Sequence, residues 1–590
     1  MSSVPEAREP SARYLEAVQP ALVRQLELLA TAPGGVERLR EFILSLAVQG
    51  KLTSQGCDDE PASALLERIR GRKLRLIASG AIKQGKQSPE LDDAEPMFEL
   101  PKGWTWVSLG ELCSYIQRGK GPAYAEQSEH KVISQKCVRW YGLDLAPARF
   151  VTPESLAKYE PIRFLRAGDL LWNSTGTGTI GRACVVPTEL DDAGLVADSH
   201  VTVVRPLEVN SVFLWRWIQS PFVQIEIEGS ASGTTNQIEL NTSTVVSQPV
   251  PLPPLAEQAR IVARVDELMR LCDALEAKGR LEAEQHARLL GALLAMLTDS
   301  STPEELAANW QRVADNFDLL LDRPEAVDAL EETILLLAVR GLLVTQDETE
   351  EPAIESLRRL RAQRAKEEQA SRSRRADSVE AEAAEEPPFA LPTGWAWAKA
   401  QDLTSPLSII TYGVLKPEWV EVGVPTVRVQ DIQAGRLLTN QVAQCAPARA
   451  EKFARTKLSE GDLLIAKDGA TLGKTAFVPK ALEGGNITQH VLRFSIAPDF
   501  NREYVRLVID SPHGQVWMRG ETQGVALPGV NVGDFRRMPI PIPPIAEQAR
   551  IVARVSELRL LCTNLRQCLA RSSATQTVLA GALIDRALAG

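Results

Sequence analysis

The feature of this sequence that most constrains its fold is a long internal duplication. Residues 251–275, PLPPLAEQARIVARVDELMRLCDAL, recur at 541–565 as PIPPIAEQARIVARVSELRLLCTNL, with 18 of 25 positions identical and an offset of 290 residues. Residues 39–70 align with 330–361, and FELPKGWTWVSLGEL at 98–112 aligns with FALPTGWAWAKAQDL at 389–403, both at an offset of 291 residues. Two copies of one domain on one chain predict a binding protein with two similar ends.

Each half is predicted to run from helices through a variable domain to a Pro-rich hinge and a long helix. At roughly 150 residues per domain, the chain has room for about four structural units. The variable segments contain short apolar clusters such as VTVV at 201–204 and HVLRF at 490–494, which are typical of strands in a mixed α/β domain. The predicted parts are a helical region and linker at 1–97, a globular domain at 98–253, a helical spacer and linker at 254–388, a second globular domain at 389–543 and a C-terminal helix at 544–590.

Both long helices are predicted to carry a narrow apolar seam, because apolar residues recur three or four positions apart after Pro254 and Pro544. Such a seam favours a helix–helix pair over a lone amphipathic helix on a core. The simplest partner for one seam is the other, packed antiparallel around a pseudo-twofold axis. The expected fold class is therefore α/β (mixed α+β), with two globular domains joined by long antiparallel coiled-coil helices. The seam residues are Ile261, Val265, Leu268, Cys272 and Leu275, and Ile551, Val555, Leu558, Cys562 and Leu565.

Composition excludes some classes of protein and leaves others open. No apolar run reaches the ~18–20 residues needed to span a bilayer, and the charged N-terminus lacks an apolar signal core, so a cytoplasmic protein is expected. The net charge is −10, but residues 389–543 hold 17 Lys+Arg against 14 Asp+Glu, and 98–253 hold 13 against 16. Nucleic-acid binding therefore stays open, provided that any electropositive face is local or supplied by a partner. The eight cysteines have no zinc-binding spacing and are expected to be buried in a reducing compartment.

Several short motifs resemble catalytic sequences, and each has a structural interpretation that we favour. GTGTIG at 176–181 matches a nucleotide-binding pattern but precedes an apparent strand, and the equivalent DGATLGKT at 468–475 loses the pattern. A tight glycine turn between strands fits both copies. Glu386-Pro-Pro-Phe resembles a methyltransferase motif, yet it lies in a linker without a cofactor-binding domain before it. We therefore predict that the chain has no catalytic residues and binds no metal. Trp104, Trp106, Trp395 and Trp397 recur in both halves and are predicted to be core anchors.

Taken together, these motifs resemble the DNA-specificity subunit of type I restriction–modification systems. The resemblance rests on the doubled P-x-PP-x-AEQ-x-R-I-V hinge, the doubled LPxGWxW segment, the doubled LAVxGxL helix and the variable domains that contain GDLL at 168–171 and 461–464. It covers essentially the full chain. It implies two target-recognition domains that each read one half of a bipartite, asymmetric DNA site. The paired helices would set the gap between the half-sites and dock two methyltransferase (modification) subunits.

The family also implies which molecules act with such a subunit. Double-stranded DNA and two modification subunits are the expected partners. Two motor-nuclease (restriction) subunits are expected to join the complex through the modification subunits. No membrane is expected to be involved. N6-adenine methylation and cleavage of unmodified DNA would be carried out by these partners. S-adenosylmethionine, ATP and Mg²⁺ would belong to them, and this chain would hold no cofactor. The alternatives are a complex that only methylates, a coiled-coil scaffold that organises proteins without reading DNA, and a stand-alone enzyme.

Candidate DNA contacts follow from residue types, because Lys and Arg bind phosphates while Arg, Asn, Gln and Lys read base edges. Each charged residue alone could equally be a solvated surface group, and His200 and His490, at equivalent positions, could be structural. In the first domain the candidates are Arg118, Lys120, Lys131, Lys136, Arg139, Trp140, Tyr141, Asn173, Ser174, Thr175, Ser199, His200, Thr234, Thr235 and Asn236. In the second they are Tyr412, Lys416, Arg428, Gln430, Lys467, Lys474, Gln489, His490, Gln523 and Asn531.

Overall fold

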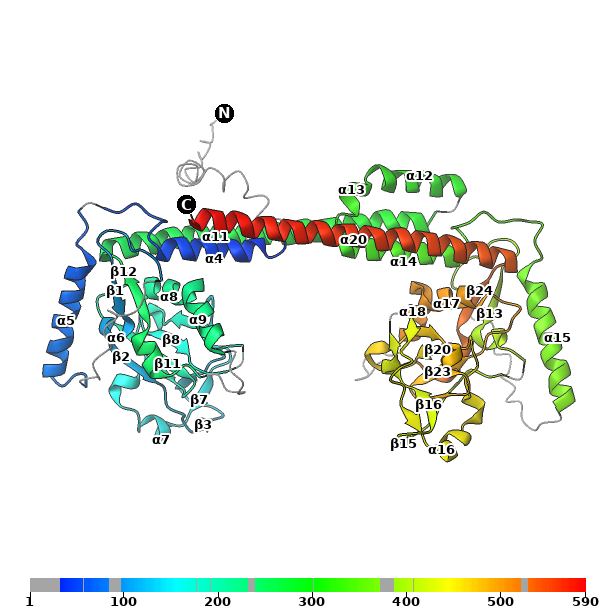
Figure 1. Cartoon of the computed structure of the whole chain (residues 1–590), viewed down its shortest axis with the longest axis horizontal. Helices are drawn as coiled ribbons and strands as arrows, with labels where there is room; N and C mark the ends of the chain where they lie inside the picture. Colours follow the sequence, from blue (N-terminus) through cyan, green and yellow to red (C-terminus); the bar gives the residue numbers. More distant parts are fainter. Residues whose placement is uncertain are drawn as a thin grey trace. The chain divides into compact units, whose positions relative to one another are not determined.

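The chain divides into two compact units in a computed structural model (Figure 1). Unit 1 holds Met1–Glu282 and Ser573–Gly590, and unit 2 holds Ala283–Ser572. The last part of the C-terminal helix thus belongs to the same unit as the first half of the chain. The structure describes residues 32–56, 58–83, 97–176, 178–191, 193–231, 239–300, 302–371, 387–406, 408–433, 435–520 and 529–589.

Unit 1 contains a globular domain built on two four-stranded sheets, with strand orders β2-β11-β8-β9 and β10-β4-β7-β3, and two strand pairs, β1–β12 and β5–β6. The strands are β1 (Thr105–Ser108), β2 (Cys113–Arg118), β3 (Tyr124–Ala125), β4 (Lys131–Ile133), β5 (Val138–Arg139), β6 (Gly142–Leu143), β7 (Arg149–Val151), β8 (Leu170–Asn173), β9 (Ala183–Val185), β10 (Val196–Ala197), β11 (Val201–Pro206) and β12 (Pro249–Leu252). The helices that begin in this unit are α4 (Gly35–Val48), α5 (Ala62–Ala78), α6 (Leu109–Leu112), α7 (Pro153–Leu156), α8 (Ser211–Gln219), α9 (Pro221–Ala231), α10 (Thr242–Ser247) and α11 (Leu255–Thr298).

Unit 2 repeats this topology, with strand orders β14-β23-β20-β21 and β15-β19-β16-β22, and with pairs β13–β24 and β17–β18. Its strands are β13 (Ala396–Lys399), β14 (Thr411–Tyr412), β15 (Trp419–Val420), β16 (Val424–Val427), β17 (Ile432–Gln433), β18 (Arg436–Leu437), β19 (Gln444–Cys445), β20 (Leu463–Ala466), β21 (Thr475–Phe477), β22 (Asn486–Ile487), β23 (Val491–Phe494) and β24 (Pro539–Ile542). Its helices are α12 (Pro303–Asp315), α13 (Phe317–Leu320), α14 (Pro324–Arg340), α15 (Ala353–Ser371), α16 (Pro447–Glu451), α17 (Arg502–Asp510), α18 (Pro512–Arg519), α19 (Val532–Arg537) and α20 (Ile545–Ala589). The mixed α+β fold with two sheet-bearing domains and long helices is confirmed.

The glycine-rich segments lie where a turn between strands was predicted. β8 pairs antiparallel with β9, and β20 pairs antiparallel with β21, so residues 176–181 and 468–475 connect neighbouring strands. Gly176, Gly178 and Gly181 all have positive φ angles, which a residue with a Cβ adopts at a cost. The interpretation as a tight turn is confirmed, and a phosphate-binding helix does not follow either segment.

The tryptophans of the LPxGWxW segments anchor the core, as predicted. Trp104 and Trp395 are each 8% exposed. Trp106 is half-buried and packs at 5.0 Å, centroid to centroid, against Phe98, while Trp397 makes the equivalent contact with Phe389 at 4.9 Å. Because both copies sit inside the units in this way, these rings are unavailable for stacking on bases.

The repeated Ala-Glu-Gln motif fixes each long helix to the globular domain of its own unit. In unit 1, Gln258 Nε2 donates to the Pro253 carbonyl at 2.9 Å, and Gln258 Oε1 accepts from the backbone N–H of Asn210, also at 2.9 Å. Asn210 caps the N-terminus of α8, so the motif ties α8 to the start of α11. Gln548 makes the same two bonds in unit 2, to Pro543 and Asn501.

The glutamate of the same motif is buried beside the first tryptophan ring of the LPxGWxW segment. Glu257 Oε2 accepts from Trp104 Nε1 at 2.9 Å, and Glu547 Oε2 accepts from Trp395 Nε1 at 3.1 Å. Both side chains are 1% exposed. Burial raises the pKa of Glu257 and of Glu547, because a charged carboxylate loses its hydration there.

This raised pKa predicts a pH-dependent stability. A carboxyl whose pKa is higher in the folded than in the unfolded state contributes stability that is lost as pH rises through the folded pKa. The Glu257→Gln/Glu547→Gln variant keeps a neutral acceptor for each indole, so its Tm relative to the unsubstituted protein should increase between about pH 4 and about pH 7. Thermal unfolding across that range measures this, with the exposed Glu284→Gln as the control. A difference that falls with pH would contradict the prediction.

The two apolar seams are buried, but their partners differ from the predicted ones. Ile261, Val265, Leu268 and Cys272 belong to one hydrophobic cluster together with Leu39, Phe42 and Ile43 of α4. Ile551, Val555 and Cys562 belong to another, together with Leu330 and Ile334 of α14. Leu275, Leu558 and Leu565 pack on these clusters as half-buried residues. Each seam also packs with the far end of the other long helix: Ala580 and Ile584 of α20 belong to the cluster of the first seam, and Leu290, Leu294 and Leu297 of α11 belong to that of the second. The long antiparallel coiled-coil helices are thus confirmed. Only the direct contact between the two seams is corrected, because each seam meets a shorter helix and the far end of the other long helix.

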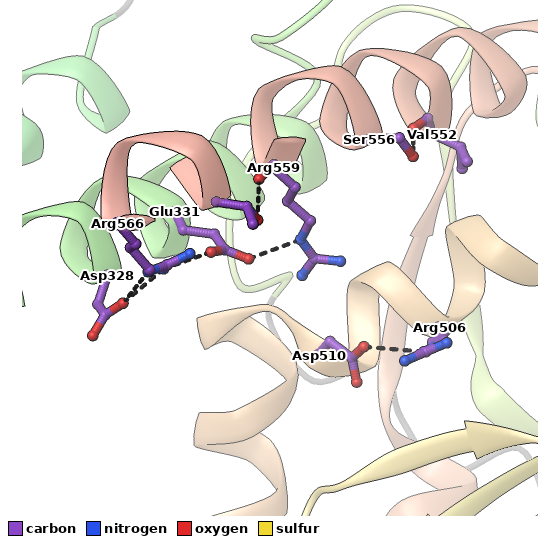
Figure 2. A network of polar contacts seen from close by, with 9 residues as sticks. Asp328, Glu331, Arg506, Asp510, Val552, Ser556, Arg559 and Arg566 are labelled. Carbon is purple, nitrogen blue, oxygen red and sulfur yellow. Dashed lines mark hydrogen bonds and ion pairs between the residues drawn. The ribbon is translucent and has the colours of Figure 1, made fainter. Parts of the chain in front are cut away.

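Ion pairs beside the seams repeat between the units with inverted polarity. In unit 1, Arg40 of α4 lies 2.7 Å from Asp273 and 3.0 Å from Glu276 of α11. The equivalent positions in unit 2 are Glu331 and Arg566, which pair at 2.7 Å between α14 and α20 (Figure 2). Figure 2 also shows Arg566 paired with Asp328, and Arg559 paired with Glu331. Because the seams are so alike in sequence, this polarity distinguishes the α4–α11 pair from the α14–α20 pair.

The polarity predicts that a charge reversal is rescued only by a reversal of its partner. Arg40→Glu should lower the free energy of unfolding of unit 1 by about 1 kcal/mol, since these pairs are largely solvent-exposed and like charges replace attraction. The Arg40→Glu/Glu276→Arg variant gives this pair the polarity that Glu331 and Arg566 have in unit 2, and it should recover part of that loss, since Asp273 remains beside the new glutamate. Urea denaturation at low salt measures both. An equal loss in the single and double variants would contradict the prediction.

The remaining composition-based expectations have mixed outcomes. Of the seven cysteines that the structure describes, six are buried and Cys568 is exposed, while Cys57 lies outside the described residues. Within the described ranges, no helix is long and apolar enough to cross a membrane.

Candidate nucleic-acid interface

In unit 1, polar side chains gather where β8 ends and β11 begins. These two strands pair antiparallel, with Asn173 opposite Val201, so the residues after β8 meet those before β11. Thr175 Oγ1 lies 2.6 Å from His200 Nδ1, and the backbone N–H of Ser174 donates to the His200 carbonyl. His200 and Ser199 are exposed. We call the set Arg118, Thr175, Ser199 and His200 edge 1.

Two acidic residues complete edge 1. Arg118, at the end of β2, forms an ion pair with Glu239 and donates to the Leu240 carbonyl at 3.0 Å. Asp198 Oδ1 accepts from the backbone N–H of His200 at 2.8 Å. Burial raises the pKa of Asp198, although the bond from His200 opposes this. These contacts fix the backbone on either side of the exposed Ser199 and His200.

In unit 2, the equivalent set lies where β20 ends and β23 begins. Asp468 Oδ2 is 2.8 Å from His490 Nδ1 and 3.3 Å from Lys467 Nζ. Gln489 Nε2 is 3.0 Å from His490 Nε2. The Lys467 carbonyl accepts from the backbone N–H of Val530 at 2.8 Å, which holds the strand end in place. We call Lys467, Asp468, Gln489 and His490 edge 2.

The two edges share one backbone frame and differ in side chains. A histidine precedes the second strand in both, and it contacts the residue two positions beyond the end of the first strand, Thr175 in unit 1 and Asp468 in unit 2. Ser199 stands where unit 2 has Gln489. Equivalent loops on a common scaffold with different polar groups suit recognition of two different ligand surfaces.

In each domain, a buried ion pair that involves the aspartate of the GDLL segment holds together the strands that carry the edge. Arg205 of β11 contacts both oxygens of Asp169 at 2.7 Å, and the two side chains are 12% and 1% exposed. Arg493 of β23 pairs with Asp462 at 2.6 Å in unit 2. These pairs fix β11 and β23 to the turns that precede β8 and β20. The sequence indicated the GDLL segment only as a repeat and gave no signal of this role.

Two residues predicted to contact DNA are buried, which corrects that part of the prediction. Asn173 and Ser174 are both 0% exposed. Asn173 Nδ2 donates to the carbonyls of Gln135 and Thr179 at 3.0 and 3.2 Å, and the Ser174 hydroxyl bonds to Thr202. Asn173 thus holds the glycine turn, and Ser174 is joined to β11. Because both side chains are covered, they do not reach a ligand in this structure.

The other candidates of unit 1 lie outside edge 1. Trp140 and Tyr141 form the tip of the β5–β6 hairpin and are 40% and 78% exposed. Arg139, in the same hairpin, lies 3.7 Å from Asp144. The bond between Asn173 and Gln135 brings the segment that carries the exposed Lys136 beside the end of β8. Lys120 is exposed after β2, and half-buried Lys131 lies in β4 with its Nζ 5.7 Å from the centre of the Phe150 ring.

In unit 2, Lys474 is exposed in the turn before β21, Lys416 is exposed with a positive φ of 46°, and half-buried Tyr412 lies in β14. Arg428 forms an ion pair with Asp431 at 3.0 Å and lies beside the exposed Gln430. Asn531 Oδ1 accepts from the backbone N–H of Gly533, so it caps α19. Thr234, Thr235, Asn236 and Gln523 lie outside the described residues. Sequence reasoning missed Asp468, although it follows a candidate lysine at the position equivalent to Thr175.

The chemistry of these edges is that of recognition. Across the described part of the chain, no group of three or more His, Cys, Asp or Glu side chains is arranged to hold a metal ion. The edges present half-buried Arg118 and Lys467 together with imidazole, hydroxyl and amide groups, which are side chains that contact phosphates and base edges.

Comparison with known proteins agrees with this chemistry. The family model described as the type I restriction modification DNA specificity domain matches residues 101–285 and 425–569. The chain is 30% identical over 569 residues to the type I restriction enzyme EcoEI specificity subunit of Escherichia coli, covering 94% of each chain. It is 30% identical over 577 residues to the EcoAI specificity subunit of the same species, again covering 94% of each.

A solved chain from a study of complex assembly and conformational transition of the type I R-M system is also similar, with 19% identity and a TM-score of 0.48, covering 83% of this chain and 99% of that one. The family model and the full-length relatives agree with the duplicated motifs and with the paired domains of one topology. The chain therefore belongs to the family of DNA-specificity subunits of type I restriction–modification systems.

Proposed function

We propose that each recognition domain reads one half of a bipartite, asymmetric DNA site, and that the reading surfaces centre on edge 1 and edge 2. As a specificity subunit, the chain recognises DNA and acts with other subunits of the system, which carry out catalysis. The observation that carries the proposal is the shared frame with different side chains: Thr175, Ser199 and His200 in unit 1 stand where unit 2 has Asp468, Gln489 and His490. Two domains that share one topology but present different polar side chains are expected to recognise two different half-sites.

The partners and cofactors complete this proposal. Two modification subunits would methylate adenine at N6 with S-adenosylmethionine, and two restriction subunits would cleave unmodified DNA with ATP and Mg²⁺. This activity would defend the cell against foreign DNA, and the cytoplasm is its expected place. The exposed Lys120, Lys136 and Lys474 would add sequence-independent phosphate contacts, so binding should weaken as salt rises.

The test is selection of DNA by the complex of this chain with its modification subunits from a duplex library randomised at every position. The expected result is enrichment of a split motif with a constant gap and two unlike halves. Failure to enrich any motif would overturn the proposal and favour a scaffold that organises proteins without reading DNA. Enrichment of a continuous motif would overturn the bipartite arrangement.

A further inference from the structure

Three side chains of edge 2 form a chain of hydrogen bonds that ends in the amide of the half-buried Gln489. Asp468 Oδ2 lies 2.8 Å from His490 Nδ1, and His490 Nε2 lies 3.0 Å from Gln489 Nε2. Asp468 follows β20 and His490 precedes β23, and the pairing of these strands holds both backbones. The His490 side chain is 47% exposed, so the chain of bonds reaches the surface.

The chemistry of the first two groups determines which way the amide faces. A carboxylate accepts hydrogen bonds and donates none, so the proton between Asp468 and His490 belongs to His490 Nδ1. In the neutral imidazole, Nε2 is then an acceptor. With Nε2 as an acceptor, Gln489 Nε2, which lies 3.0 Å away, donates one amide hydrogen to it, whereas a 180° turn of the amide would set its oxygen against the nitrogen lone pair.

Among the described residues, the Gln489 side chain makes no other hydrogen bond. When the hydrogen given to His490 is the one trans to the amide oxygen, the second N–H and the carbonyl oxygen lie side by side and can bind one ligand together. Glutamine uses this pair to bind adenine in the major groove, where the N–H donates to N7 and the oxygen accepts from the N6 amino group. Guanine presents two acceptors at the same place, so the amide oxygen would face another oxygen.

We propose that Gln489, held by Asp468 and His490, reads an adenine in the half-site bound by unit 2; this rests on the proposed function of the edges. Unit 1 lacks this chain of hydrogen bonds, because Ser199 stands in place of Gln489 and His200 contacts the hydroxyl of Thr175. A hydroxyl both donates and accepts, so it neither fixes the imidazole tautomer nor offers a bidentate amide edge. Adenine reading of this kind is thus confined to unit 2.

The test is the selection from a randomised duplex library by the complex with its modification subunits, repeated with variants of the full chain. Gln489→Ala should reduce the preference for adenine at one position of one half-site by about 5- to 150-fold, the discrimination expected of one bidentate contact. Gln489→Glu should shift that position toward cytosine, whose N4 amino group donates to a carboxylate. The exposed Gln363→Ala, on α15, is the matched control and should leave the motif unchanged.

The positioning role of the other two residues is tested by a conservative rescue. Asp468→Ala should weaken the same adenine preference, whereas Asp468→Asn retains a carbonyl acceptor for His490 Nδ1 and should preserve much of it. His490→Ala should also weaken it. Thermal unfolding of each variant separates these effects from loss of the fold.

Two results would overturn the inference while leaving the proposed function intact. One is a split motif in which Gln489→Ala changes no position. The other is a uniform loss of binding across all sequences, which would assign Gln489 to a phosphate. If the unsubstituted complex enriched no motif, the proposed function itself would fail.

Discussion

Replacing Asp169 with alanine is expected to lower the free energy of unfolding of unit 1 by about 3–5 kcal/mol. The cause is the guanidinium that remains: Arg205 is 12% exposed and would lose both carboxylate contacts, at 2.7 Å each, while staying buried. Its two other bonds, to the carbonyls of Ile162 and Phe164, keep it from turning to solvent. Urea denaturation followed by tryptophan fluorescence measures the loss, since Trp172 in β8 is fully buried in this unit.

Two controls distinguish the effect of leaving a buried charge unpaired from the effect of losing a side chain. The Asp169→Leu/Arg205→Met variant removes both charges and should recover most of the stability, because an apolar pair of similar volume is often neutral or better. Asp462→Ala should reproduce the single-variant loss in unit 2, where Arg493 is 14% exposed. A loss below about 1 kcal/mol in Asp169→Ala would show that the pair behaves as a surface ion pair.

Much of the fold could be predicted from the sequence, because the chain repeats itself. Two occurrences of one motif mark structural positions, so the long helices, the tryptophan anchors and the glycine turns followed from their recurrence at a nearly constant offset. The glycine turn was predictable for a second reason: the first copy matches a nucleotide-binding pattern and the equivalent segment of the second copy loses it, so a tight turn is what the two have in common.

The packing partners of the seams could not be predicted, because the near identity of the two seams, which revealed them in the sequence, does not distinguish one from the other. Two seams of nearly the same sequence are equally good partners for several helices. The information that separates them lies in Arg40 and Glu331, on the shorter helices, and in the inverted charges at Glu276 and Arg566. Only contacts between segments distant in sequence show that these residues meet.

The candidate site was predicted in outline and not in detail. Residue type indicated His200, Gln489 and His490, and the structure places them at the two edges. Residue type does not reveal burial, so Asn173 and Ser174 were predicted to be exposed when strand pairing covers them. Asp468 was missed because an acidic residue is a poor candidate for contact with DNA, although it can orient a residue that makes one.

Exchanging residues 405–535 for the corresponding segment of a relative with a different target is expected to change one half of the recognised site and leave the other half unaltered. The segment carries edge 2 and both four-stranded sheets of unit 2, whereas β13 and β24, which pair with each other, lie outside it. The Trp395–Glu547 bond also lies outside, and Gln548 bonds the backbone of Asn501 and not its side chain, so the link to α20 is retained.

Sequencing of modified bases in the DNA of cells that express the exchanged subunit with its partners measures the outcome. The equivalent exchange of residues 114–245 in unit 1 is the matched control, and it should change the opposite half only. Stability of the exchanged domain should depend on whether the donor retains an N-capping residue at the position of Asn501. A change in both halves after either exchange would mean that the two domains do not read DNA independently, because residues of one unit would then influence bases contacted by the other.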